Sequence, residues 1–317
     1  MSTFISRGLS ELDLPSAAIA ADAVTHWDLP RAVVLVACNA DAGSRAAARV
    51  ALEVAPPDSV IRALAVNDAG VIGHAIPPLG AAAHTVSDLA GEQLRTAVKQ
   101  QLDGCACDAW PLDVRAGDPA MVICHTADDL AASLIVIGLN EHDFVDRALR
   151  RETSLRVTRH AKVPVLTVVP WAIGRPRVII AAVDFSAASV RAARVAASLA
   201  ATDCAFTLVH VLSPAESTPA ARSFAATIAR SVEDGLVRLA RDIALPNGGT
   251  VEWTVLRGNA ADEIAALAAK EGADLIALGA SPGGIGNVLH SSVRASLMRQ
   301  ATRSLLVVPA LNGQVVS

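Results

Sequence analysis

The sequence contains one long pattern twice. The longest match pairs 114–138 (VRAGDPAMVICHTADDLAASLIVIG) with 255–279 (VLRGNAADEIAALAAKEGADLIALG) nearly element for element. Two shorter matches pair 45–55 (RAAARVALEVA) with 191–200 (RAARVAASLA), and 164–170 (PVLTVVP) with 304–309 (SLLVVP). The offset stays at about 141 to 145 residues, which is a domain length and far longer than a solenoid period. We therefore expect two copies of one domain.

The repeat sets the predicted domain boundaries. They are an N-terminal lead at 1–29, a first domain at 30–170, a linker at 171–176 (WAIGRP) and a second domain at 177–311. Within each copy, short apolar runs such as 31–38 and 133–138 alternate with helical segments. Such continuous runs are typical of strands buried on both faces of a parallel sheet. Alternating strands and helices predict an α/β fold with right-handed crossovers.

Composition excludes several classes of protein. The chain is 52% hydrophobic and 18% charged, so it can bury large cores. A net charge of −4, with no long run of one sign, argues against a nucleic-acid-binding face. We see neither a signal peptide nor an apolar stretch of membrane-spanning length. Five irregularly spaced cysteines fit a reducing compartment, so we predict a cytoplasmic protein without membrane partners.

The stretch 273–309 has the layout of an anion site. An apolar run ends at Gly279, a glycine-rich loop follows at 280–286, and a helical segment begins near Ser291 and Ser292. Glycine backbone amides approach a ligand closely, and a helix start favours an anion. Strand, glycine loop and helix start together predict a phosphate cradle, although such loops are common.

Each half resembles a domain of the universal stress protein family, and the whole resembles its tandem type. The residues that carry the resemblance in the second half are 183–186 (VDFS), 208–211 (LVHV), 257–264 (RGNAADEI), 273–279 (ADLIALG) and 305–309 (LLVVP). The resemblance implies two tandem open five-stranded parallel sheets with helices on both faces, of the adenine-nucleotide alpha hydrolase-like, Rossmann-like type. It also implies association of the two domains through their last strands, as an internal pseudo-dimer. Whether two chains associate further stays open.

Many members of that family bind ATP through two spaced glycines, a third glycine followed by Ser or Thr, and an Asp after the first strand. The second half keeps Gly279, Ser292 and Asp184. It departs from the pattern at Pro282, at Ser291 and in a spacer one residue short. Proline removes an N–H donor, whereas serine adds a hydroxyl, so the cradle is weakened rather than clearly abolished.

The resemblance implies a role for each site residue. Asp184 would bind the ribose or adenine, and Val211 would pack on the base. The phosphates would be held by Gly279, Gly283, Gly284, Gly286, Ser291 and Ser292. A structural interpretation stands beside each role. Asp184 also fits an Asx turn capping the helix at 186–200, and Val211 also fits plain core.

The first half lacks the nucleotide pattern. The loop at 139–146 has no glycine and carries three acids, Arg151 and Glu152 replace the final Gly-Ser, and Asn39 replaces the Asp. Like charge repels a phosphate, so we predict no ATP site in this half. Arg147, Arg150 and Arg151 form either an anion patch or, the favoured interpretation, a solvated helix face.

Other reactive side chains give weak signals. Cys105 and Cys107 lack the further ligands of a metal site and the spacing of a redox pair, so we predict no metal. Cys38, Cys124 and Cys204 fit small core residues, and His210 fits a satisfied core or edge histidine. His290 precedes the two serines and is a minor phosphate candidate. No nucleophile is placed beside a base, so catalysis is not indicated.

Three functions follow as hypotheses. The main one is a non-catalytic stress-response protein that binds ATP in its second domain and has protein partners. The second is an ATP-independent interaction scaffold in which both nucleotide loops have decayed. The third, resting only on fold analogy, is an ATP-hydrolysing or adenylate-forming enzyme.

Overall fold

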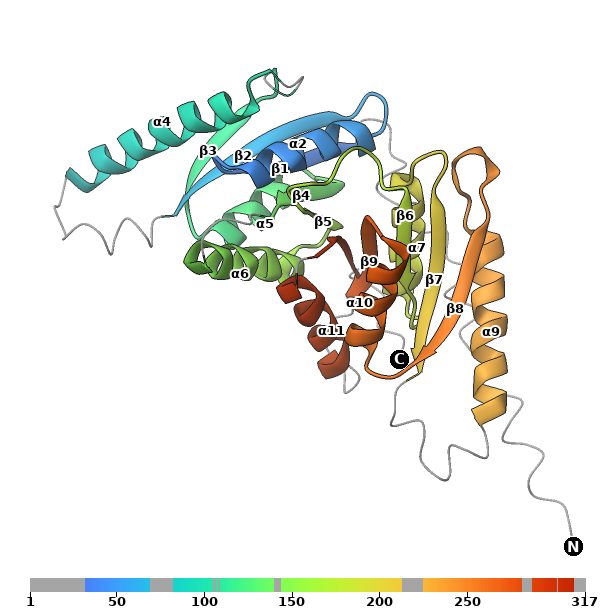
Figure 1. Ribbon diagram of the computed structural model, residues 1–317. Helices are drawn as coiled ribbons and strands as arrows, with labels where there is room; N and C mark the ends of the chain where they lie inside the picture. The colour runs from blue at the N-terminus through green and yellow to red at the C-terminus, as the bar shows by residue number, and fades with distance from the viewer. Residues whose placement is uncertain are drawn as a thin grey trace, which may run out of the picture.

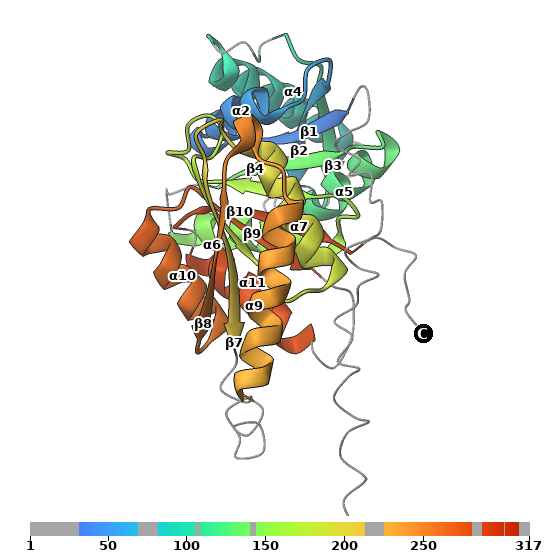
Figure 2. The same cartoon turned by 90° about the vertical axis from the view of Figure 1, so that its right-hand side faces the viewer.

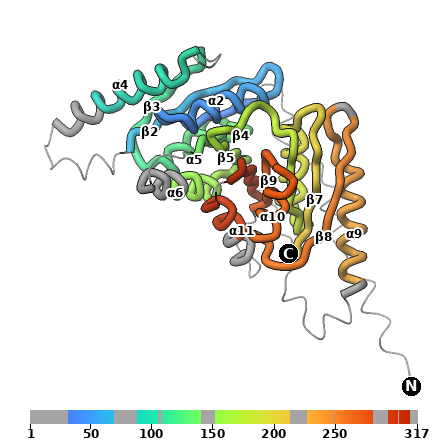
Figure 3. The backbone as a smooth tube through the Cα atoms, in the orientation of Figure 1, coloured from blue at the N-terminus to red at the C-terminus, as the bar shows by residue number. Residues whose placement is uncertain are grey.

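The computed structural model describes residues 32–68, 82–104, 107, 109–139, 144–212, 225–280, 287–300 and 302–310. For 82–87, 144–151, 225–226, 247 and 287–292 it describes the backbone alone. In these ranges strands and helices alternate in two successive sets (Figures 1 and 3). No helix among the described residues is long and apolar enough to cross a membrane.

The first set runs from β1 to β5. Its strands are β1 (Val33–Cys38), β2 (Val60–Asp68), β3 (Leu112–Gly117), β4 (Leu134–Gly138) and β5 (Val165–Val168). Its helices are α2 (Ala42–Val54), α4 (Ala82–Leu102), α5 (Pro119–Asp129) and α6 (Phe144–His160). The strands β1 and β4 coincide with the apolar runs predicted at 31–38 and 133–138.

The second set repeats the first. Its strands are β6 (Val178–Ala182), β7 (Ala205–Leu212), β8 (Val251–Arg257), β9 (Leu275–Ala280) and β10 (Ser304–Pro309). Its helices are α7 (Ala187–Leu199), α9 (Ala225–Asp242), α10 (Ala260–Glu271) and α11 (Asn287–Gln300), with a short 3-10 turn at Pro246–Gly248. The helix α9, which the sequence analysis did not name, lies along β7 and β8 (Figures 1 and 2).

The ten strands lie in the order β3-β2-β1-β4-β5-β10-β9-β6-β7-β8. All neighbours within each set are parallel. Each half therefore has the predicted doubly wound, five-stranded topology, and the two halves are related by a pseudo-twofold axis.

The last strands of the two halves join the sheets. β5 and β10 pair antiparallel, with Leu166 opposite Leu306. Thr167 donates from Oγ1 to the Leu305 carbonyl at 3.3 Å, and the Val169 amide donates to Ser304 Oγ at 3.3 Å. The expected association of the halves through their last strands is thus confirmed. The prediction of two separate sheets is corrected: the pairing of β5 with β10 joins them into one ten-stranded sheet, because the apolar edge strands satisfy one another's backbone groups.

Helices cover both faces of this sheet. Side chains of α2, α4, α7 and α9 pack on one face in a core that is continuous between the halves. On the other face α5 and α6 cover the first half, and α10 and α11 cover the second, each over its own core. The alternation is visible in β1, where Val34 and Val36 face one layer and Leu35 faces the other.

The two halves also meet through α6 and α11 (Figure 1). Thr158 Oγ1 lies 3.7 Å from the Met298 sulfur, and Arg294 donates from Nη1 to the Thr158 carbonyl at 3.3 Å. Helix-to-helix contact beside the paired strands makes the boundary a packed interface rather than a flexible joint.

The cysteines follow the prediction in part. Cys38 and Cys124 are buried, and burial raises the pKa of the Cys38 thiol to about 12 and of the Cys124 thiol to about 11. Cys204 is only half-buried. Cys107 is disulfide-bonded, which differs from the expected set of reduced thiols.

Candidate functional site

The candidate site of the second half lies at the carboxyl ends of β6 and β9. These strands are neighbours, but β6 leads to β7 on its other side, so the chain leaves them in opposite directions. In open α/β sheets such a switch point leaves a crevice that ligands occupy. Asp184 follows β6, and Gly279 lies near the end of β9.

Asp184 is held by the start of α7. One carboxylate oxygen accepts hydrogen bonds from the Ser186 amide at 2.9 Å and the Ser186 hydroxyl at 2.6 Å. Ser186 is itself the N-cap of α7, since its Oγ accepts from the Ser189 amide at 3.2 Å. The Asx turn weighed in the sequence analysis is therefore present, and the exposed Asp184 still faces a cavity.

Gly279 is required by packing. A Cβ on this residue would stand 2.3 Å from the Ser189 amide nitrogen and 2.6 Å from the Ala188 carbonyl carbon. No side chain fits at such distances from backbone atoms. Gly279 therefore lets the first turn of α7 rest directly on β9, whether or not a ligand binds.

Both faces of β7 contribute residues to the candidate site. His210 lies on the α9 side, where its Nδ1 is 2.7 Å from the Val183 carbonyl oxygen and its ring centroid is 5.4 Å from that of Phe185. The prediction of a satisfied histidine is confirmed. Phe185 has φ +63, a left-handed conformation that is unusual for a bulky residue and places strain beside Asp184. Val211 lies on the other face, against the core under α10 and α11.

A small cavity of about 100 Å³ connects these residues. Its walls are mostly apolar, and Asp184 and Arg294 are its charged residues. The lining comprises Ala182, Val183, Asp184, Ser189, Val209, His210, Val211, Ala260, Ile264, Leu278, Gly279, Val293 and Arg294. Burial, with a smaller contribution from Arg159, lowers the pKa of Arg294. The cavity thus offers an apolar pocket with one carboxylate and one guanidinium among its lining residues.

The structure places three of the eight predicted site residues together: Asp184, Val211 and Gly279. Gly283, Gly284 and Gly286 lie outside the described residues, as does the loop around them. Ser291 and Ser292 lie in the first half of α11, and their side chains, like that of His290, are outside the described part. Their assignment to phosphates stays a prediction.

The equivalent edge of the first half is built differently. Asp41 is the N-cap of α2 and accepts from the Ser44 amide at 2.8 Å and the Ser44 hydroxyl at 3.0 Å. The Asn39 amide donates to Ser44 Oγ at 2.6 Å. After β4, Leu139 is buried, with 4% of its surface exposed. Residues 140–143 and the side chains of 144–151, including the three arginines, lie outside the described part.

Sequence reasoning missed Arg294 and Ile264 as cavity residues. Nothing in the family pattern quoted for the site points to either. Arg294 lies on α11, the helix after the glycine loop, two residues beyond Ser292. Its place in the cavity is predictable only when the helix is known to start near residue 287. Ile264 was quoted as part of the repeat, but its direction depends on the packing of α10.

Comparisons with known proteins agree with this architecture. The model of the universal stress protein family matches residues 31–169 and again 176–309. A universal stress protein from Archaeoglobus fulgidus superposes with a TM-score of 0.60 at 17% identity, covering 87% of this chain and 98% of its own. A putative universal stress protein from Pseudomonas aeruginosa gives 0.54 at 14% identity, covering 90% and 95%.

A solved universal stress protein in complex with cAMP covers 43% of this chain and 98% of its own at 22% identity, with a TM-score of 0.30. No curated protein sequence matches the chain. The fold and the switch-point cavity define a doubly wound α/β protein with a crevice at the carboxyl ends of its central strands. With both halves matched by the family model, this chain belongs to the universal stress protein family and is of its tandem form.

Proposed function

We propose that this chain is a non-catalytic, cytoplasmic stress-response protein that binds one adenine nucleotide at the carboxyl edge of its second half. The convergence of Asp184, Val211 and Gly279 on one cavity at the switch point carries the proposal. Membership in the universal stress protein family supports the stress-response role.

The chemistry of the cavity suits a nucleoside. Apolar side chains such as Val211 and Ile264 offer a surface for a base, and the exposed carboxylate of Asp184 offers acceptors for ribose hydroxyls. The volume of about 100 Å³ accounts for only the inner end of such a ligand. The proposal assigns the phosphates to Gly283, Gly284 and Gly286 and to the serines at the start of α11.

Calorimetric titration with ATP tests this assignment. We expect one site per chain, and Asp184→Ala should weaken it about tenfold, the value of a charge-assisted hydrogen bond. Gly284→Glu should also weaken it, because a carboxylate would repel the phosphates. The matched control is Asn39→Ala, the same change at the equivalent position of the first half. Two equal sites, or equal losses from Asp184→Ala and Asn39→Ala, would refute a site confined to the second half.

A second candidate function is an ATP-independent interaction scaffold. It is favoured by two contacts: Asp184 already accepts two hydrogen bonds from Ser186, and Gly279 is explained by packing alone. Mass spectrometry of protein purified from cells separates the candidates. Co-purified ATP or AMP supports the nucleotide site, and protein free of nucleotide that also fails to bind added ATP supports the scaffold.

The non-catalytic assignment rests on the composition of the site. Among the described residues, no group of three His, Cys, Asp or Glu side chains is arranged to hold a metal ion. His210 is engaged by the Val183 carbonyl rather than by a nucleophile. Phosphate release from ATP above the background rate would instead support the enzyme hypothesis.

A further inference from the structure

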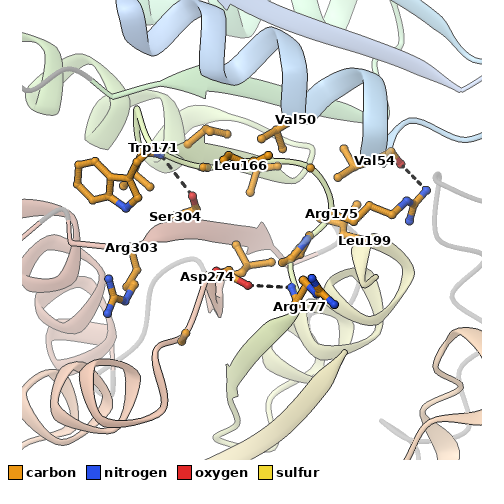
Figure 4. A pocket seen from close by; sticks show the side chains of 18 of the residues that line it. Val50, Val54, Leu166, Trp171, Arg175, Arg177, Leu199, Asp274, Arg303 and Ser304 are labelled. Carbon is orange, nitrogen blue, oxygen red and sulfur yellow. Dashed lines mark hydrogen bonds between the residues drawn. The ribbon is translucent and has the colours of Figure 1, made fainter. Parts of the chain in front are cut away.

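A larger cavity lies between the two halves, under the linker. Its volume is about 300 Å³, at the lower end of the range of about 300–1,000 Å³ that small-molecule pockets occupy. In Figure 4, Val50 and Val54 of α2 line it from above, the linker crosses it, and Asp274 and Arg303, from the turns before β9 and β10, lie below. It is a different site from the switch-point cavity. The interdomain cavity is lined by Leu275, the first residue of β9, whereas the switch-point cavity is lined by Gly279, near the other end of that strand.

The inner wall of this interdomain cavity is apolar. Val50 and Val54 come from α2, Leu166 and Val168 from β5, and Leu199 from α7. At the mouth, the linker side chains Trp171 and Ile173 are 48% and 83% exposed, which is high for such large apolar groups. A ligand with an apolar chain would contact both the inner wall and these two linker side chains.

The outer wall is cationic. Arg175 donates from Nη1 to the carbonyls of Ser198 at 3.1 Å and Ala200 at 3.4 Å, and from Nη2 to that of Val54 at 3.5 Å. Arg303 donates from Nη1 to the Thr302 carbonyl, while its Nε is buried without a hydrogen-bond partner. Among the described residues neither arginine has a carboxylate within ion-pair distance. The Nε atom is out of reach of solvent, but Arg303 as a residue is only half-buried, so its charged guanidinium can meet an anionic ligand in the cavity.

The acidic group of the cavity is already engaged. Asp274 accepts from the backbone amides of Arg177 at 2.8 Å and Val178 at 3.0 Å. Arg177 in turn forms an ion pair with Asp203 through its side chain. Bonds from neutral amides leave the negative charge of Asp274 in place, but Arg175 and Arg303 together outweigh it, so the lining keeps a net positive charge.

We propose that the interdomain cavity binds a small amphipathic carboxylate, with its apolar chain against Leu166 and Leu199 and its carboxylate at Arg303. Arginine pairs with planar carboxylates through two parallel hydrogen bonds, which gives the site selectivity for the anion. Because both halves and the linker line the cavity, such a ligand would stabilise the joined arrangement of the halves.

Decanoate is a suitable probe, and calorimetry on the full chain is the main measurement. We expect one saturable site for decanoate and no saturable site for decylammonium, which has the same chain and the opposite charge. Emission of Trp171 should shift on binding, and Trp171→Phe should remove that shift. Arg303→Gln should weaken decanoate about tenfold, the value of one charge-assisted hydrogen bond.

Two controls locate the effect. Arg299→Gln removes an exposed arginine from α11 outside the cavity and should leave decanoate affinity unchanged. Asp184→Ala should also leave it unchanged, so the outcome is independent of the proposed nucleotide site. Circular dichroism of Arg303→Gln checks that the variant is folded. Equal binding of decylammonium, unchanged affinity in a folded Arg303→Gln, or no saturable decanoate binding would each overturn the proposal.

Discussion

The two halves share a topology, but different residues follow the carboxyl ends of their central strands. In the first half the helix α2 begins with Asp41 as its N-cap, and buried Leu139 follows β4. In the second, α7 begins with Ser186, which leaves Asp184 two residues earlier at the edge of a cavity. Moving the carboxylate by this short distance changes it from a helix cap into a group that a ligand can reach.

The same comparison separates structural residues from functional ones. Both halves have a glycine at or near the end of the fourth strand, Gly138 and Gly279, although only the second half keeps part of the family's nucleotide pattern. A Cβ on Gly138 would lie 2.1 Å from backbone atoms of Gly43, much as one on Gly279 would lie 2.3 Å from Ser189. The glycine is thus explained by close packing of helix on strand, so its presence alone is no evidence for a ligand.

The largest expected effect tests this packing. Gly138→Ala and Gly279→Ala should each lower the free energy of unfolding by about 3 kcal/mol, because a methyl group would overlap backbone. Gly91→Ala in α4 is the control: its Cβ would lie 3.8 Å from the nearest side chain, and the change should raise stability by about 0.5 kcal/mol. Urea unfolding measures all three. A Gly138→Ala protein as stable as the parent would break the equivalence of the halves.

A smaller loss of stability is expected when the N-caps of α2 and α7 are removed. Asp41→Ala and Ser186→Ala should each cost about 1 kcal/mol of unfolding free energy, the usual loss of an N-cap. Asp184→Ala should cost less, because Ser186 continues to cap α7. Thermal and urea unfolding of the three variants give the comparison. If Asp184→Ala costs as much as Asp41→Ala, the Asp184 carboxylate stabilises α7 as a cap does, and the two halves do not differ in this respect.

The smallest effect is a difference in acid sensitivity. Asp118 caps α5 and pairs with Arg156, whereas the equivalent cap of α10 is Asn259, which does not titrate. The hydrogen bond from Arg156 is the main cause that lowers the pKa of Asp118 below its ordinary 3.8. A lowered folded-state pKa stabilises the protein above the unfolded value, and this stabilisation is lost as the pH falls through the folded value.

Asp118→Asn should therefore reduce the acid dependence of stability below about pH 4, by less than about 1 kcal/mol because the pair is partly exposed. Asn259→Asp is the reciprocal change and should add acid dependence to the second half. Unfolding measured from pH 3 to pH 7 tests both. An unchanged pH profile for Asp118→Asn would show that the ion pair contributes nothing measurable.

Much of the fold was readable in the sequence because buried strands and amphipathic helices carry local signals. The repeat, the strand–helix alternation and the positions of most elements follow from runs such as 133–138 and 275–279. The helix α9 was not named, since its repeat counterpart matches it only weakly. For the site, Asp184, Val211 and Gly279 were predicted from the family resemblance, while Arg294 was not, because its direction depends on how α11 meets α6.

By itself, the sequence determined that this chain holds two copies of one α/β domain and that only the later copy keeps the family's acid and serine. The tertiary structure decided how the copies join: β5 and β10 pair edge to edge, and the linker closes a cavity between α2 and α7. Local patterns specify which residues are buried, since burial follows from period and composition. Which surfaces then face one another depends on contacts more than a hundred residues apart, such as Arg294 with Thr158, and no local pattern encodes those.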